Sequence, residues 1–169
     1  MIRIPHAFNL IYRWTFFTAL IVLTAAGRIA AQGPIERPCA NTDLSGMWEM
    51  ILLRPLDAVD RERDFALLQE YQAMRFGADS SFSRIGASRP LPTEQATKLL
   101  AASPRESYRL QPSGRLEFLN EQGLPVAAAE CSYFIQGNPQ IGLSAGTVSI
   151  LWRNYGKPAI VQAFKKVSE

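Results

Sequence analysis

The sequence predicts a mainly β protein, an antiparallel up-and-down β-barrel of about eight strands with a short helix inserted near 93–102. Two observations predict this fold class. Short strand-like segments follow one another along the chain, and turn-forming Gly, Pro, Asn and Asp residues separate most of them. Strands joined in this way form a meander, and a meander of this size can remove its open edges by closing into a barrel.

The expected strands lie near 47–52, 71–76, 82–85, 107–111, 115–119, 126–136, 147–153 and 158–167. For the inserted helix, Thr93 is a good N-cap and Pro104 follows the end. The charged stretch 57–68 is compatible with either a short helix or an ordered loop, and Asp57 can cap a helix there. We find no internal repeat, and the length of 32–169 suits a single domain.

Residues 1–31 have the pattern of a cleaved secretory signal peptide. Arg3 and Arg13 form a positive N-terminal region, and the run 14–27 is uncharged and mostly apolar. The segment Ile29-Ala30-Ala31 then offers a small residue at a cleavage point. This pattern predicts an exported protein that is periplasmic or extracellular.

A membrane anchor is the alternative interpretation of the same segment. The run between Arg13 and Arg28 holds 14 residues, whereas a spanning helix needs about 20. We therefore expect no stable membrane anchor after cleavage. The mature chain is expected to begin near Gln32, although a cut after Ala26-Gly27 fits the pattern too.

Removal of this leader changes the charge of the protein. Three arginines and no acid leave with it, so the mature chain carries 15 basic and 15 acidic groups. A formal net charge of zero gives no support for a nucleic-acid partner. The only histidine, His6, lies in the leader as well. Without histidine, the mature chain cannot form a Ser-His-Asp triad, a Cys-His pair or a His-ligated zinc site.

Two cysteines, Cys39 and Cys131, are the only ones in the chain. An exported protein meets an oxidising compartment, where an even number of cysteines favours pairing over two separate free thiols. We therefore predict one disulfide that ties the N-terminal segment to a late strand.

The segment Gly46-Met47-Trp48 stands at the entry of the first strand of the mature chain. The glycine lets the backbone turn sharply, and the tryptophan can plug one end of a small barrel. With this segment, its length and its succession of hairpins, the chain resembles the lipocalin-like, or calycin, group. The helix near 93–102 is in an unusual place for that group.

The resemblance implies an up-and-down barrel that holds a small apolar molecule in its mouth. It also implies that a basic side chain from the last strands lies over Trp48, for which Arg153, Lys165 and Lys166 are the candidates. Under the same resemblance, Gly46 would have a structural role together with Trp48 and this cation. The expected ligand-binding side chains are those of Trp48, Met50, Met74, Phe76, Tyr108, Phe118, Phe134 and Trp152.

A second function class competes with ligand binding. The same side chains can simply fill a small barrel and leave no cavity. The protein would then be a structural or interaction module of the cell envelope, with an envelope protein as its partner. Under that interpretation, contacts would come from the apolar side chains of Ile51 and Tyr155 and from the 137–146 loop.

The sequence does not favour an enzyme. The acids Asp43, Glu49, Glu106, Glu117 and Glu130 are scattered, and no spacing forces two carboxylates together for acid–base chemistry. We find no glycine-rich phosphate loop and no clustered set of metal ligands. We therefore expect no cofactor and no metal.

Overall fold

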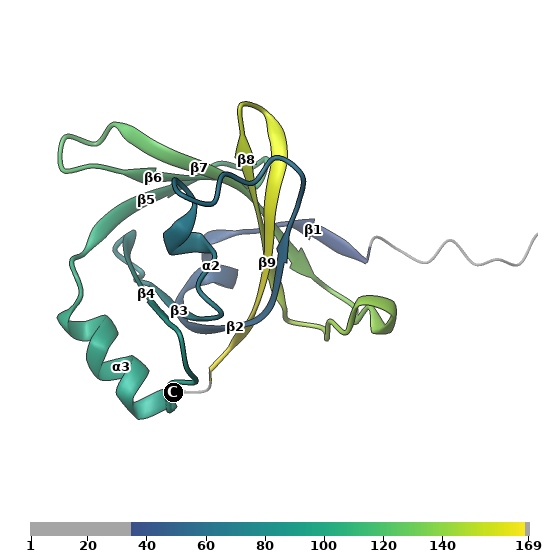
Figure 1. The fold of residues 1–169 in the computed structure, drawn as a ribbon, viewed down its shortest axis with the longest axis horizontal. Helices are drawn as coiled ribbons and strands as arrows, with labels where there is room; N and C mark the ends of the chain where they lie inside the picture. The colour runs from purple at the N-terminus through teal and green to yellow at the C-terminus, as the bar shows by residue number, and fades with distance from the viewer. Residues whose placement is uncertain (1–34, 168–169) are drawn as a thin grey trace, which may run out of the picture. The chain divides into compact units, whose positions relative to one another are not determined.

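The computed structural model describes residues 35–167, which contain a closed eight-stranded antiparallel barrel and one extra strand (Figure 1). The strands are β1 (Glu36–Pro38), β2 (Gly46–Pro55), β3 (Tyr71–Phe76), β4 (Ser81–Ala87), β5 (Glu106–Leu110), β6 (Arg115–Leu119), β7 (Pro125–Phe134), β8 (Val148–Asn154) and β9 (Lys157–Lys166). The helices are α2 (Asn41–Leu44) and α3 (Thr93–Ala102), and short 3-10 turns are η1 (Phe65–Leu67) and η2 (Pro139–Ile141). The predicted leader and its cleavage lie outside the described residues.

The barrel closes because its first and last strands pair. Strands β2 to β9 follow one another around the sheet in chain order, and β9 returns to β2. Their register runs from Trp48 opposite Lys166 to Pro55 opposite Ile160. The extra strand β1 pairs with the end of β7. The predicted up-and-down barrel of about eight strands is confirmed.

The hairpins between consecutive strands follow from local turn chemistry. Strands β8 and β9 are joined through Tyr155 and Gly156, which both have positive φ, as a type I′ turn requires. The turn between β5 and β6 contains Gly114 at φ 84°. A Cβ at Gly114 would lie 2.6 Å from the carbonyl oxygen of Cys131, so glycine is also required by the close approach of β7.

Helix α3 lies outside the ring of strands (Figure 1) and occupies the residues expected for the inserted helix. Its buried side chains, Ala96 and Leu100, pack with Met47 and Ala73 on the outer face of the sheet. The expected N-cap is wrong by one position, because Pro92 is the capping residue and Thr93 begins the helix. The Thr93 hydroxyl instead donates a hydrogen bond of 2.9 Å to Glu49 on β2. Within residues 35–167, no helix has the length and apolar character that crossing a membrane requires.

The stretch between β2 and β3 is an ordered loop with one 3-10 turn, η1. We call residues 56–70 the cap segment. Its side chains Ala58, Val59, Leu67 and Leu68 are partly buried against the barrel core. Of the two structures that the sequence allowed for 57–68, the ordered loop is therefore the one observed.

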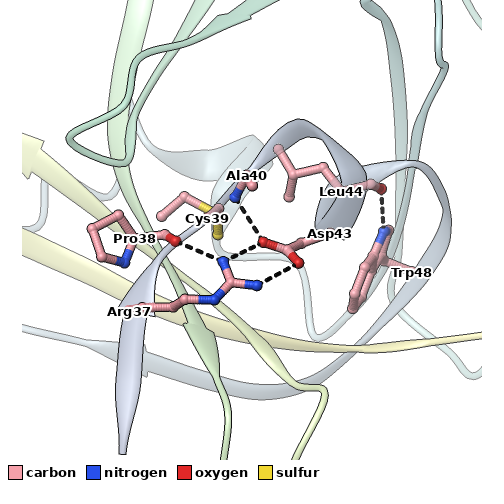
Figure 2. Close-up of a disulfide and its surroundings, with 8 residues drawn as sticks. Arg37, Pro38, Cys39, Ala40, Asp43, Leu44 and Trp48 are labelled. Carbon is pink, nitrogen blue, oxygen red and sulfur yellow. Dashed lines mark hydrogen bonds and ion pairs between the residues drawn. A yellow bond between two sulfur atoms is a disulfide. The ribbon is translucent and has the colours of Figure 1, made fainter. Parts of the chain in front are cut away.

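One end of the barrel is closed by α2 and by Trp48, which is only 2% exposed (Figure 2). The indole Nε1 of Trp48 donates a hydrogen bond of 2.6 Å to the carbonyl oxygen of Leu44, the last residue of α2. In Figure 2, Arg37 makes two hydrogen bonds to Asp43 on α2, at 2.6 and 2.8 Å. The predicted disulfide between Cys39 and Cys131 is present, so α2 is tied to β7 as well.

Of the three cations proposed for Trp48, the structure selects Lys166. Its Nζ lies 5.8 Å from the centroid of the Trp48 ring, and the two residues are directly opposite in the β2–β9 register. The expectation for Lys165 is wrong, because Lys165 is opposite Glu49 and its ammonium lies 3.8 Å from that carboxylate. The expectation for Arg153 is wrong too, since Arg153 belongs to the far end of β8 and binds Glu130.

Candidate ligand-binding pocket

A cavity of about 480 Å³ lies at the end of the barrel opposite α2, beneath the cap segment. Its walls come from the cap segment, from β4 to β8 and from the β8–β9 turn. Strands β4 and β5 pair through only two residue pairs, Ser81 with Ser107 and Phe82 with Glu106. The rest of β4 therefore has no β5 neighbour at this end, and Arg84 of β4 lines the cavity together with Glu106 at the start of β5.

The floor of the cavity is aromatic. The rings of Phe118 and Trp152 are stacked, with 5.2 Å between their centroids and 17° between their planes. Phe82 packs at an angle against Phe118, with centroids 4.7 Å apart. The indole Nε1 of Trp152 donates a hydrogen bond of 2.8 Å to the side chain of Gln162. Because its polar atom is satisfied there, the ring can offer an apolar face to a ligand.

Buried polar groups hold the cap segment over this floor. Gln162 is fully buried and donates a hydrogen bond of 2.8 Å to the carbonyl oxygen of Leu67. Asn154 of β8 donates to the carbonyl oxygen of Ala58 at 2.8 Å and to the carboxylate of Asp64 at 2.6 Å. Each bond joins the segment to a residue 90 to 96 positions later in the chain.

Asp64 is the charged member of this group of contacts. Burial by itself would raise the pKa of its carboxyl, but hydrogen bonds from the Asp60 amide and from Asn154 oppose that effect. Arg63 adds a third hydrogen bond and its positive charge. The pKa of Asp64 is consequently lower than its ordinary value, and the carboxylate form is the one that holds the cap segment.

Arg84 differs from the other two arginines of the cavity. It shares the inner face of β4 with Phe82, and it is directly opposite Met74, which is fully buried. Within the part of the chain that the structure describes, its guanidinium has no hydrogen bond and no ion pair. Burial lowers the pKa of Arg84, and the charge of Glu106 opposes this shift.

The two other arginines that line the cavity have carboxylate partners. Arg153 binds the carboxylate of Glu130 through two hydrogen bonds, at 2.8 and 3.1 Å. Arg63 contacts Asp64 at 3.4 Å and also lies over the ring of Tyr155. These pairs leave Arg84 and Glu106 as the charges that face the cavity without a partner at ion-pair distance among the described residues.

The structure distributes the predicted ligand-binding side chains over three places. Phe118 and Trp152 line the cavity. Five others fill the barrel interior and do not line this cavity, namely Trp48, Met50, Met74, Phe76 and Tyr108. The expectation that Phe134 binds the ligand is wrong, because Phe134 packs with Leu143 and Ala163 in a separate cluster on the outer face of the sheet. The filled interior therefore holds most of the expected lining, and only two of the predicted side chains reach this cavity.

Sequence reasoning missed two of the side chains that define the cavity, Phe82 and Arg84. The strand at 82–85 was expected, and alternation along it places both residues on one face. The available signal was an arginine two residues after a phenylalanine, on the same face of this strand. It was not decisive by itself, since the sequence does not show which face of that strand is the inner one.

Three of the scattered acids are held by arginines. Glu117 is buried and accepts hydrogen bonds from Arg109 and Arg115, which lower the pKa of its carboxyl. Asp43 and Glu130 are each held by one arginine. Over residues 35–167, no group of three or more His, Cys, Asp or Glu side chains is arranged to hold a metal ion.

No protein-family model matches the sequence, and comparisons with curated proteins and with solved structures found no significant match. The closed antiparallel barrel of eight strands is compatible with a calycin-like fold.

Proposed function

We propose that this protein is an exported, non-catalytic member of the lipocalin-like group that binds a small, mostly apolar ligand beneath the cap segment. The observation that carries the proposal is the cavity of about 480 Å³ over the stacked rings of Phe118 and Trp152. Ligand sites in proteins are typically concave, about 300–1,000 Å³ in volume, and lined by aromatic and apolar side chains with a few polar groups.

The walls agree with an apolar occupant. Ala127 of β7, directly opposite Phe118 in the β6–β7 register, adds a small apolar side chain beside the aromatic floor. Export is supported by the buried disulfide, which is typical of oxidising compartments, together with the signal-like leader. A ligand binder of this kind needs no cofactor and no metal.

The proposal is tested by titrating the mature protein with N-phenyl-1-naphthylamine, a neutral apolar dye whose fluorescence rises in apolar surroundings. We expect saturable binding to the wild type. The variant Ala127→Phe should lose this binding, because Ala127 lines the cavity and the new ring would occupy its volume.

Ala101→Phe is the matched control, since Ala101 is an exposed residue of α3 that does not line the cavity. Equal dye binding by Ala127→Phe and by the wild type, with both proteins folded by circular dichroism, would contradict the proposal.

A second candidate function is an interaction module of the cell envelope with an envelope protein as its partner. It is favoured by exposed apolar side chains, among them Tyr155 at 94% and Ile51 at 41%. Exposed aromatic residues at turns are common without a partner, so the cavity outweighs this observation. Failure of every apolar probe to bind the wild type would leave this second function as the better interpretation.

A further inference from the structure

We propose that the ligand of this cavity is an amphipathic carboxylate, with its apolar body on the aromatic floor and its carboxylate on the guanidinium of Arg84. This inference rests on the proposed function, because it names the chemical class that the same cavity selects. The juxtaposition that carries it is an inward-facing arginine without a partner beside the stacked pair of Phe118 and Trp152.

The first step concerns the position of Arg84. Phe82 and Arg84 alternate on the inner face of β4, and Phe82 belongs to the barrel core. Met74, directly opposite Arg84 on β3, is fully buried in the same core. The guanidinium therefore extends from an apolar wall into the cavity and not from the outer surface of the barrel.

The second step concerns charge balance. A charge that is partly withdrawn from water is costly unless an opposite charge or hydrogen bonds compensate it. Arg63 and Arg153 have such compensation from Asp64 and Glu130. Arg84 has none at ion-pair distance within residues 35–167, and Glu106 acts on it only over a longer distance. An anionic group in the cavity would supply the compensation that the protein lacks.

The third step concerns the kind of anion. A guanidinium presents a planar set of donors that matches a carboxylate through two parallel hydrogen bonds. One arginine balances one negative charge, and Glu106 at the rim disfavours a second. A monocarboxylate fits these conditions better than a phosphate dianion. The remaining volume, over aromatic rings, suits a hydrocarbon body.

Decanoate and decan-1-ol provide a matched pair of probes, because they share a chain length and differ in charge. Their dissociation constants are measured by displacement of N-phenyl-1-naphthylamine at pH 7. The wild type should bind decanoate roughly 10- to 100-fold more tightly than decan-1-ol, the range expected for hydrogen bonds to a charged group. Arg84→Met should bring this ratio near one while decan-1-ol still binds, and Arg84→Lys should keep part of the preference.

Glu106→Gln tests the same charge balance from the opposite side. Removing this carboxylate should tighten binding of decanoate and leave decan-1-ol unchanged, because only the anion is repelled by Glu106. Glu36→Gln is the matched control, since Glu36 is an exposed acid of β1 that does not line the cavity. It should change neither constant.

The outcomes separate this inference from the proposed function. If decan-1-ol binds the wild type and decanoate shows no preference, the cavity is a ligand site and the assignment to carboxylates is wrong. The assignment to carboxylates is also wrong if the folded Arg84→Met variant keeps the full preference for decanoate. It is wrong as well if Glu106→Gln weakens decanoate binding, which would mean that Glu106 holds Arg84 in position. If neither probe nor the dye binds the wild type, both the inference and the proposed function fail.

Discussion

At the scale of single residues, Trp48 shows how one side chain closes an end of the barrel. Its ring is almost wholly buried, its indole N–H is satisfied by Leu44, and Lys166 lies over its face. The sequence indicated the burial, because a Gly-x-Trp segment at a strand entry is a local signal. It did not identify Lys166, since the register of the first strand against the last is set by closure of the whole sheet.

We expect Trp48→Ala to lower the free energy of unfolding by ~3–5 kcal/mol, as deletion of a large core aromatic does. The loss combines the removed apolar contact with an unsatisfied carbonyl oxygen at Leu44. Urea denaturation of the two proteins measures it. Leu124→Ala is the control, because Leu124 is exposed and its removal should change stability by ~0.5 kcal/mol or less. Equal losses in the two variants would contradict the role assigned to Trp48.

At the scale of elements, the hairpins and α3 could be predicted from the sequence because each depends on nearby residues. Turn residues between Tyr71 and Ile85, for example, define β3 and β4 locally. The cap segment could not be predicted in the same way. Its order depends on Asn154 and Gln162, which lie on β8 and β9, 96 and 95 residues away from their partners in the chain. Arg84 could not be predicted because the sequence does not show which face of β4 is the inner one.

Acid should loosen the cap segment through protonation of Asp64. Its pKa is lower in the folded protein than in the unfolded chain, so the carboxylate adds stability that is fully present above the unfolded pKa of about 3.9. This contribution is lost as the pH falls through the lower folded pKa. The stability difference between the wild type and Asp64→Asn should therefore shrink between neutral pH and about pH 2.

Urea denaturation at a series of pH values measures that difference, and hydrogen exchange locates the change in residues 56–70. Asp57→Asn is the matched control, because Asp57 is an exposed acid of the same segment. A difference between the wild type and Asp64→Asn that stays constant across the whole pH range would show that ionisation of Asp64 does not hold the segment.

At the scale of the whole molecule, long-range pairings hold the fold together. The β2–β9 ladder closes the barrel, and the disulfide joins two residues that are 92 positions apart. Pairing of Cys39 with Cys131 could be predicted because the chain contains only two cysteines. The cavity at one end could not, because it depends on where the eight strands diverge and on which side chains fill the interior.

The last prediction concerns that disulfide. Replacing Cys39 and Cys131 together by serine should lower the free energy of unfolding by ~2–5 kcal/mol. In the chain-entropy model the bridge acts mainly by restricting the unfolded chain, so its removal should leave the native barrel intact and increase the surface exposed on unfolding. The urea m-value should then rise along with the loss of stability.

Urea denaturation of the oxidised wild type, the reduced wild type and the double variant measures both quantities. The reduced wild type is the control, since it loses the bond without a change of side chain. Agreement between the reduced protein and the double variant would assign the effect to the covalent link. A loss in the double variant alone would assign it to two buried serine hydroxyls, because both cysteines are nearly inaccessible to water. Stability and m-value equal to those of the oxidised wild type would contradict the prediction.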